Sequence, residues 1–234
     1  MKRLNALTIS VWKVNLNQIF KFLVYLAGTT LFFSAPNHAF AASSTWTNGG
    51  GDNFWSNTAN WSSGIPTIGD TAYFNATSSA DCIVDIDATV RNFTIEAGYT
   101  GIIRQQAGVR IYTDRHFDQH GGTFVGGFDT LDINNSFQLY GGTFVAPPGV
   151  MRINRHFWHY TGADFRHNNG TIVFIGGNSN FRFDSQTDTV HNLILALDNN
   201  RRLNCNNQDT VLIEGDLIVN DGFINNGYLK MLNG

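Results

Sequence analysis

The sequence predicts an all-β fold, a single-stranded parallel β-helix (solenoid) with about 20 residues per coil. Similar segments, residues 111–124, 131–144 and 151–162, follow one another at a constant spacing. They contain β-forming residues and paired glycines rather than helix formers. A fixed period of this kind is typical of a solenoid, in which each repeat buries its apolar side only against its neighbours. A second similarity relates residues 89–95 to residues 189–195 and predicts that both segments share a phase, five coils apart.

Apolar residues alternate along each segment, which indicates the side chains that face the inside of the coil. Because successive side chains of a strand point to opposite faces, Ile133 and Phe137 are expected on the same, inner face. Coils stacked about 4.8 Å apart bring equal phases into register. We therefore expect a core column formed by Phe117, Phe137 and Phe157, with Ile133 and Ile153 in a neighbouring column.

Glycine and amide residues indicate the corners of the coil. Gly122, Gly142 and Gly162 share one phase, where we expect positive φ or packing too close for a β-carbon. A second corner is expected to hold a polar column whose side chains bond from coil to coil. The residues assigned to this column are Asp114, Asn134, Asn154 and Glu214.

The composition excludes several classes of function. The chain has 234 residues, a formal net charge of −3 and 14% charged residues, so it lacks the basic surface that nucleic-acid binding requires. Its two cysteines, Cys82 and Cys205, are too few for a disulfide framework or a zinc site, and we expect two buried thiols. Nucleophile-elbow, phosphate-loop and CxxC motifs are absent. No cofactor and no nucleic-acid partner are expected.

Residues 1–41 have the features of a secretory signal peptide. An apolar stretch, residues 22–33, precedes the A-x-A cleavage pattern of residues 39–41. Four basic residues come before the apolar stretch: Lys2, Arg3, Lys13 and Lys21. The stretch is shorter than the roughly 20 residues of a membrane span, and an uncleaved N-terminal anchor is the alternative. We expect a mature chain without a transmembrane segment that is secreted or displayed at the cell surface.

The mature chain begins with a segment of different composition. Residues 42–80 are rich in Trp, Asn and Gly, and the solenoid is expected across residues 81–234. A β-helix exposes an unpaired coil at its end, so we expect Trp46, Trp55 and Trp61 to form an N-terminal cap over the first coil. Stacking on sugar rings is the alternative for these indoles. The last residues read as a further coil cut short, so the solenoid is expected to be truncated at its C-terminus.

Two stretches resemble a known group of proteins. The first is the Trp-Thr-Asn-Gly-Gly-Gly of residues 46–51, continued by Trp-Ser-Asn and Asn-Trp up to residue 61 and by residues 69–75. The second is the Gly-Asp-Leu-Ile-Val of residues 215–219. Both resemble segments of exported bacterial β-solenoid surface proteins, the autotransporter-passenger-like and haemagglutinin-like families with β-strand repeats. The resemblance implies a right-handed parallel β-helix on the bacterial outer surface.

Five histidines fall within about two coils and are candidate metal ligands: His116, His120, His156, His159 and His167. His116 and His156 share a phase two coils apart, a distance of roughly 9.6 Å. One ion cannot bridge that distance directly with metal–nitrogen bonds of about 2.1 Å. We therefore expect exposed polar residues here and assign no metal site.

Three carboxylates are candidates for a catalytic pair, because β-helices often act on carbohydrates. Asp114, Asp118 and Asp132 fall in neighbouring coils, and a glycosidase needs two carboxyl groups about 5–5.5 Å or about 6.5–9.5 Å apart. Nothing in the sequence indicates an acid with a raised pKa, so no catalytic residue is assigned. We expect a non-catalytic structural or adhesive solenoid whose partners are host or environmental glycans or envelope components. A carbohydrate-binding or polysaccharide-degrading module is the alternative.

Overall fold

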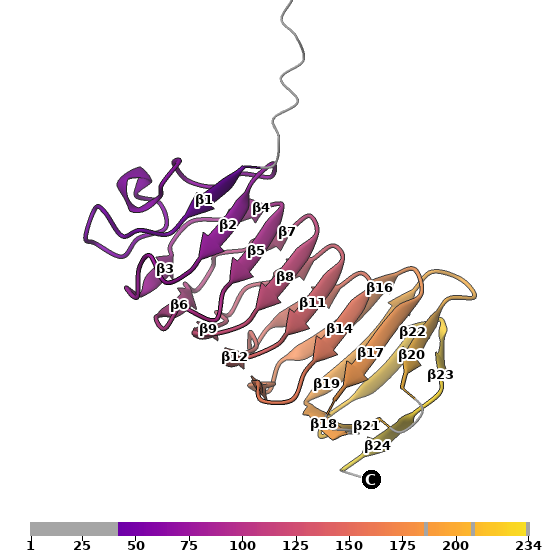
Figure 1. The fold of residues 1–234 in the computed structure, drawn as a ribbon. Coiled ribbons are helices and arrows are strands. Elements are labelled where there is room, and N and C mark those ends of the chain that lie inside the picture. Colours follow the sequence, from indigo (N-terminus) through magenta and orange to yellow (C-terminus); the bar gives the residue numbers. More distant parts are fainter. Residues whose placement is uncertain (1–41, 185–186, 207–208, 233–234) are drawn as a thin grey trace, which may run out of the picture. The chain divides into compact units, whose positions relative to one another are not determined.

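The computed structural model describes residues 42–184, 187–206 and 209–232. The expected signal peptide, residues 1–41, lies outside the described residues. The described chain winds into a parallel β-solenoid of about seven turns, with about 21 residues per coil, and its one helical element is a 3₁₀ turn, η1, at Thr58–Asn60. Figure 1 shows the coils stacked in chain order. The predicted fold class is confirmed, while the right-handed winding stays a prediction.

Each complete coil contributes one strand to each of three faces, and the strands of neighbouring coils pair in parallel. The first face is a nine-stranded sheet in the order β1 (Ser43–Thr45), β2 (Thr71–Phe74), β5 (Asn92–Ile95), β8 (His116–Gln119), β11 (Ser136–Leu139), β14 (His156–His159), β17 (Ser179–Phe183), β20 (Arg202–Cys205), β23 (Phe223–Asn225). The second face is a seven-stranded sheet in the order β4 (Ala88–Val90), β7 (Ile111–Thr113), β10 (Leu131–Ile133), β13 (Val150–Ile153), β16 (Thr171–Gly176), β19 (Asn192–Leu197), β22 (Leu217–Asp221).

The third face is divided into two sheets. Its first part is a five-stranded sheet in the order β3 (Cys82–Val84), β6 (Ile102–Gln105), β9 (Thr123–Val125), β12 (Thr143–Val145), β15 (Asp164–Arg166). Its second part is a three-stranded sheet in the order β18 (Thr187–Val190), β21 (Thr210–Ile213), β24 (Tyr228–Met231). The first two strands of the nine-stranded sheet fall within the expected cap segment, residues 42–80, so that segment also contributes to the solenoid.

The constant period holds only in the middle of the stack. Phe137 pairs with Phe117 and Phe157, which are equally far from it along the chain. Phe157 in turn pairs with Phe181, across a longer stretch of chain. The additional residues lie in turns and in β16, which has six residues where β13 has four. Turns lie outside the backbone ladder, so they lengthen a coil without disturbing the register of the strands.

The correspondence expected between residues 89–95 and residues 189–195 is wrong. Val90 lies in β4 on the second face, whereas Val190 lies in β18 on the third face. Through five successive pairings Phe93 reaches Cys205, not Leu193. Several coils are longer than those in the middle of the stack, so five coils contain more residues than the spacing between the two similar segments.

Columns of apolar side chains fill the inside of the coils. Phe117, Phe137 and Phe157 are fully buried in the predicted register, with successive ring centroids 5.7 Å and 4.9 Å apart. Ile133 and Ile153 pair with each other and are also buried. A second phenylalanine column packs edge to face against the first from the third face: Phe124, Phe144 and Phe165. Edge-to-face contacts favour aromatic pairs beyond the area that they bury, so these columns hold neighbouring coils together.

The three predicted corner glycines adopt left-handed backbone conformations. The φ values of Gly122, Gly142 and Gly162 are 57°, 75° and 97°. At Gly142 a β-carbon would also lie only 2.4 Å from the carbonyl oxygen of Gly122 in the coil before it. Both the backbone conformation and the close stacking therefore require glycine at this corner.

The polar column at the second corner is shorter than expected. Asn154 donates a hydrogen bond from Nδ2 to Oδ1 of Asn134 at 2.9 Å, which links two coils as the sequence predicts. The placement of Glu214 in this column is wrong. Glu214 follows β21 at the corner between the third and second faces, because the later coils do not keep the period of the middle ones.

The third face is interrupted between β15 and β18, which belong to different sheets although they lie in successive coils. An inward-facing ion pair lies beside this interruption, with His159 Nδ1 2.6 Å from Asp188 Oδ2. His159 Nε2 lies 3.0 Å from the carbonyl oxygen of Ala163, so both ring nitrogens face acceptors. Burial lowers the pKa of His159, but the hydrogen bonds and charge of these acceptors outweigh it and raise the pKa overall.

Candidate functional site

The three tryptophans of the N-terminal segment lie inside the protein. Trp46 and Trp55 are fully buried and Trp61 is 4% exposed. Trp61 packs edge to face against both other indoles, at centroid distances of 5.1 Å and 4.5 Å, and all three contact Phe74 of β2. Trp55 also stacks on Phe93 of the next coil.

This arrangement decides what the indoles can do. A sugar-binding platform needs exposed ring faces, and these faces are covered by other aromatic rings. The indole N–H groups of Trp46 and Trp61 donate to the carbonyl oxygens of Ala80 and Trp55. The geometry is that of a cap packed on the first coils, and the stability that the cap contributes stays a prediction.

Two of the three candidate catalytic carboxylates, Asp118 and Asp132, lie on different faces. Asp118 lies in β8 on the nine-stranded sheet, whereas Asp132 lies in β10 on the seven-stranded sheet. Asp132 is held between two guanidinium groups: Arg110 Nε donates to it at 2.6 Å, and Arg152 Nη1 lies 3.4 Å away. These contacts tie the Asp132 carboxylate to two neighbouring arginines rather than to a second carboxyl group.

Asp118 is a carboxyl group with a raised pKa. Burial, followed by the charge of Glu96, raises the pKa of Asp118 to about 6. Its Oδ1 atom is buried without a hydrogen-bond partner among the described residues. A raised pKa is typical of a general acid, but Asp132, one of the two carboxylates that the sequence suggested beside it, lies on another face.

The histidines grouped by sequence separate into different environments. His116 and His156 lie on the outer face of the nine-stranded sheet, on either side of Ser136, and burial is the main cause that lowers the pKa of both. His120 stacks on Tyr140 at 4.4 Å at the next corner. His159 faces inward, in the ion pair described above. The expectation that all five histidines are exposed polar residues is wrong for His159, whose side chain is 12% exposed. Among the described residues, His167 is the one of the five that belongs to a group of possible metal ligands.

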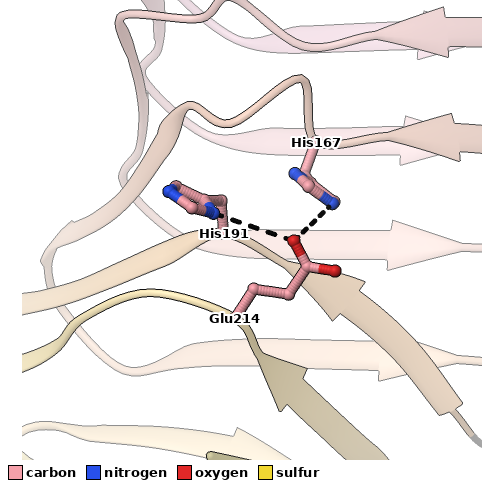
Figure 2. Close-up of side chains that lie close together, drawn as sticks. All are labelled: His167, His191 and Glu214. Carbon is pink, nitrogen blue, oxygen red and sulfur yellow. Dashed lines mark ion pairs between the residues drawn. The ribbon is translucent and has the colours of Figure 1, made fainter. Parts of the chain in front are cut away.

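His167 lies beside two residues that the sequence did not connect with it, His191 and Glu214 (Figure 2). The three follow β15, β18 and β21, so they occupy the same corner in three successive coils. Glu214 Oε2 lies 3.4 Å from His167 Nε2 and 3.8 Å from His191 Nδ1. The imidazole planes are 13° from parallel, with centroids 5.9 Å apart. Figure 2 shows the carboxylate reaching from its coil toward both rings.

One hydrogen bond indicates which ring nitrogen of His167 carries a proton. The backbone N–H of Asn169 donates to Nδ1 of His167 at 3.1 Å, so the neutral ring has its proton on Nε2, toward Glu214. Nδ1 of His191 is buried and has no hydrogen-bond partner among the described residues. A metal on His167 Nε2 would move that ring's proton to Nδ1 and open the contact with Asn169, at a cost of about 1 kcal/mol.

Sequence reasoning missed this group because it relied on a constant period. The separation from His167 to His191 differs from the separation from His191 to Glu214, and both are longer than the predicted period. A usable signal was present. Each of the three residues directly follows a strand of the third face, so counting strands rather than residues would have aligned them.

No protein-family model, no curated protein and no solved structure matches the chain. The resemblance to exported bacterial surface proteins therefore depends on the sequence motifs alone. Within residues 42–184, 187–206 and 209–232, no helix has the length and apolar character needed to cross a membrane.

Proposed function

We propose that the chain is a non-catalytic structural and adhesive β-solenoid, secreted or displayed at the cell surface, that binds its partners on the outer faces of its coils. The observation that carries the proposal is the continuous ladder of nine parallel strands over a filled apolar interior. Such a stack presents the same phases repeatedly along a long surface, which suits a stalk or an extended binding face.

The placement of the polar residues supports a non-catalytic role. Asp118 and Asp132 lie on different faces, and Asp132 is paired with two arginines. The hollow beside Asp132 is lined by the same arginines together with Tyr112, over which Arg110 lies at 5.5 Å. These groups bind one another, and they do not form a pair of carboxyl groups facing a shared substrate.

Export is the part of the proposal that depends on the N-terminal sequence. The basic residues, the apolar stretch and the A-x-A pattern within residues 1–41 are those of a secretory signal peptide. Together with the resemblance to autotransporter-passenger-like and haemagglutinin-like proteins, they support display on a bacterial outer surface. Glycans or envelope components are the partners that such a location would offer.

An aromatic strip on the nine-stranded side supports carbohydrate binding as the second candidate. Tyr140 stacks on His120 and on Tyr160, at 4.4 Å and 4.3 Å, and Arg182 lies over Tyr160 at 5.8 Å. Neighbouring rings cover much of one another's faces in this ladder, so a sugar would meet mainly ring edges. Trp158 adds an outward-facing indole, stacked beside the imidazole of its own strand.

Two measurements on the same protein test the proposal: binding to a panel of glycans and envelope fractions, and release of reducing sugar from polysaccharides. We expect binding without sugar release. Trp158→Ala should weaken that binding without lowering the melting temperature, whereas Tyr112→Ala, on another face, serves as the control and should leave binding unchanged. Release of reducing ends would contradict the non-catalytic role, and failure to bind any glycan or envelope fraction would contradict the adhesive role.

A further inference from the structure

We propose that His167, His191 and Glu214 form a binding site for a divalent transition-metal ion, with zinc as its occupant, and that the ion joins three successive coils. The proposal is independent of adhesion or catalysis. It concerns the corner between the third and second faces, away from the aromatic strip and the tryptophan cap.

The donor atoms match zinc in kind and in spacing. Two imidazole nitrogens and one carboxylate oxygen are ligands that zinc prefers, and tetrahedral bonds of about 2.0–2.1 Å place ligand atoms about 3.3 Å apart. The carboxylate oxygen of Glu214 lies 3.4 Å and 3.8 Å from the two imidazole nitrogens. All three donor atoms lie within 4.8 Å of one another. Small rotations of the two nearly parallel rings in Figure 2 would bring them around one ion.

The state of His191 is a second, independent observation. Its Nδ1 atom is buried and unbonded among the described residues, although buried polar atoms in proteins nearly always have a partner. This nitrogen faces the carboxylate of Glu214 from a distance beyond hydrogen bonding. A metal ion between them would supply the missing partner. The side chains remain 22–40% exposed, so an ion can enter and a water molecule can complete the coordination.

The position of the site gives the metal a structural role. His167 directly follows β15 and His191 directly follows β18, and these are the two strands between which the third face is interrupted. Coordination would therefore link successive coils where no strand ladder links them, and Glu214 would add the coil after that. Because an ion that binds only the folded state stabilises it, zinc should protect this end of the stack.

Titration of the metal-stripped protein with zinc chloride, followed by calorimetry, tests the site. We expect one zinc ion per chain and a higher melting temperature with zinc. Replacing a residue that only hydrogen-bonds a zinc ligand already weakens metal affinity about 10- to 100-fold. His191→Ala and Glu214→Gln remove ligands themselves, so each should weaken zinc binding at least about tenfold. His156→Ala, a histidine on the nine-stranded sheet, is the matched control and should leave zinc affinity unchanged.

Two further readouts keep the test decisive if a variant folds poorly. Cobalt bound to the unaltered protein should give the strong visible absorption of a tetrahedral site, and zinc should displace it. Hydrogen exchange should slow in β18 and β21 when zinc is added. Absence of zinc binding, or binding that His191→Ala and Glu214→Gln leave intact, would overturn the site. Zinc binding without protection of β18 and β21 would overturn its role in joining the coils.

Discussion

Phe137 offers the sharpest test of how the core holds the coils together. Its ring is fully buried and its centroid lies 4.6 Å from that of Phe144 and 4.9 Å from that of Phe157. Phe117 and Phe165 complete its aromatic surroundings, at 5.7 Å and 6.5 Å. Replacing it with alanine removes a ring that touches the coils on both sides.

The expected cost of Phe137→Ala is about 4–5 kcal/mol in the free energy of unfolding, at the upper end of the 3–5 kcal/mol range for buried Phe→Ala changes. Two features of the site put the cost at the upper end of this range. Backbone ladders fix the neighbouring coils at about 4.8 Å, so they cannot close the cavity, and each lost aromatic pair costs about 0.5–1.5 kcal/mol beyond its buried area.

Urea unfolding followed by circular dichroism measures this cost. Gln138 is the matched control, because it is the next residue on the same strand and faces outward with a half-buried side chain. Its replacement by alanine should cost under about 0.5 kcal/mol, as is usual at surface positions. Equal losses of stability at the two positions would refute the inward assignment of Phe137 and the register on which the core depends.

The other predictions concern the cap, two titrating groups and association. Trp55→Ala should cost about 3–5 kcal/mol and lower the melting temperature; an unchanged melt would contradict the cap. Asp118 binds its proton more tightly in the folded state, so the free energy of unfolding should fall as pH rises from about 4 to 6, by at most about 3 kcal/mol. Asp118→Asn should abolish that fall. The same fall in the variant would refute the assignment to Asp118. His159 has a raised pKa, so its stabilising ion pair with Asp188 is fully present below pH about 6.5 and is lost as pH rises through the pKa of His159 in the folded state. His159→Gln should remove that loss of stability in melts recorded at several pH values. A variant with the same pH profile as the unaltered protein would exclude this contribution of the ion pair. Exposed apolar side chains on β22–β24 should make residues 42–234 self-associate in sedimentation, whereas a monomer at all concentrations would contradict this.

The core could be predicted from the sequence because its cause is local. Alternation along a strand and a constant spacing were enough to align Phe117, Phe137 and Phe157, since the two spacings between them are equal. The buried thiols are also as expected, because Cys82 and Cys205 are both free and buried. The phenylalanine column needed only the inward direction of each side chain and the spacing of the coils. The free thiols needed only the long separation of the two cysteines along the stack.

The polar groups could not be predicted in the same way, because their partners depend on turn lengths elsewhere. His191 and Glu214 join His167 only after coils of two different lengths, and the constant period instead assigned Glu214 to another corner. The inward direction of His159 follows from alternation after Phe157, but its partner Asp188 comes from a later coil beside the interruption of the third face. Small changes in turn length preserve an apolar column but change which polar side chains meet.

The register from β2 to β17 can be measured directly with two spin labels. Tyr73 and Arg182 both face outward and are joined by five successive pairings of the nine-stranded sheet. At about 4.8 Å per coil, their backbones should lie about 24 Å apart. Electron–electron double resonance on a Cys82→Ala/Cys205→Ala background should give a narrow distribution near that distance. A distribution centred well beyond it, or one too broad for a rigid stack, would contradict the coil register on which the core, the proposed binding faces and the metal site all depend.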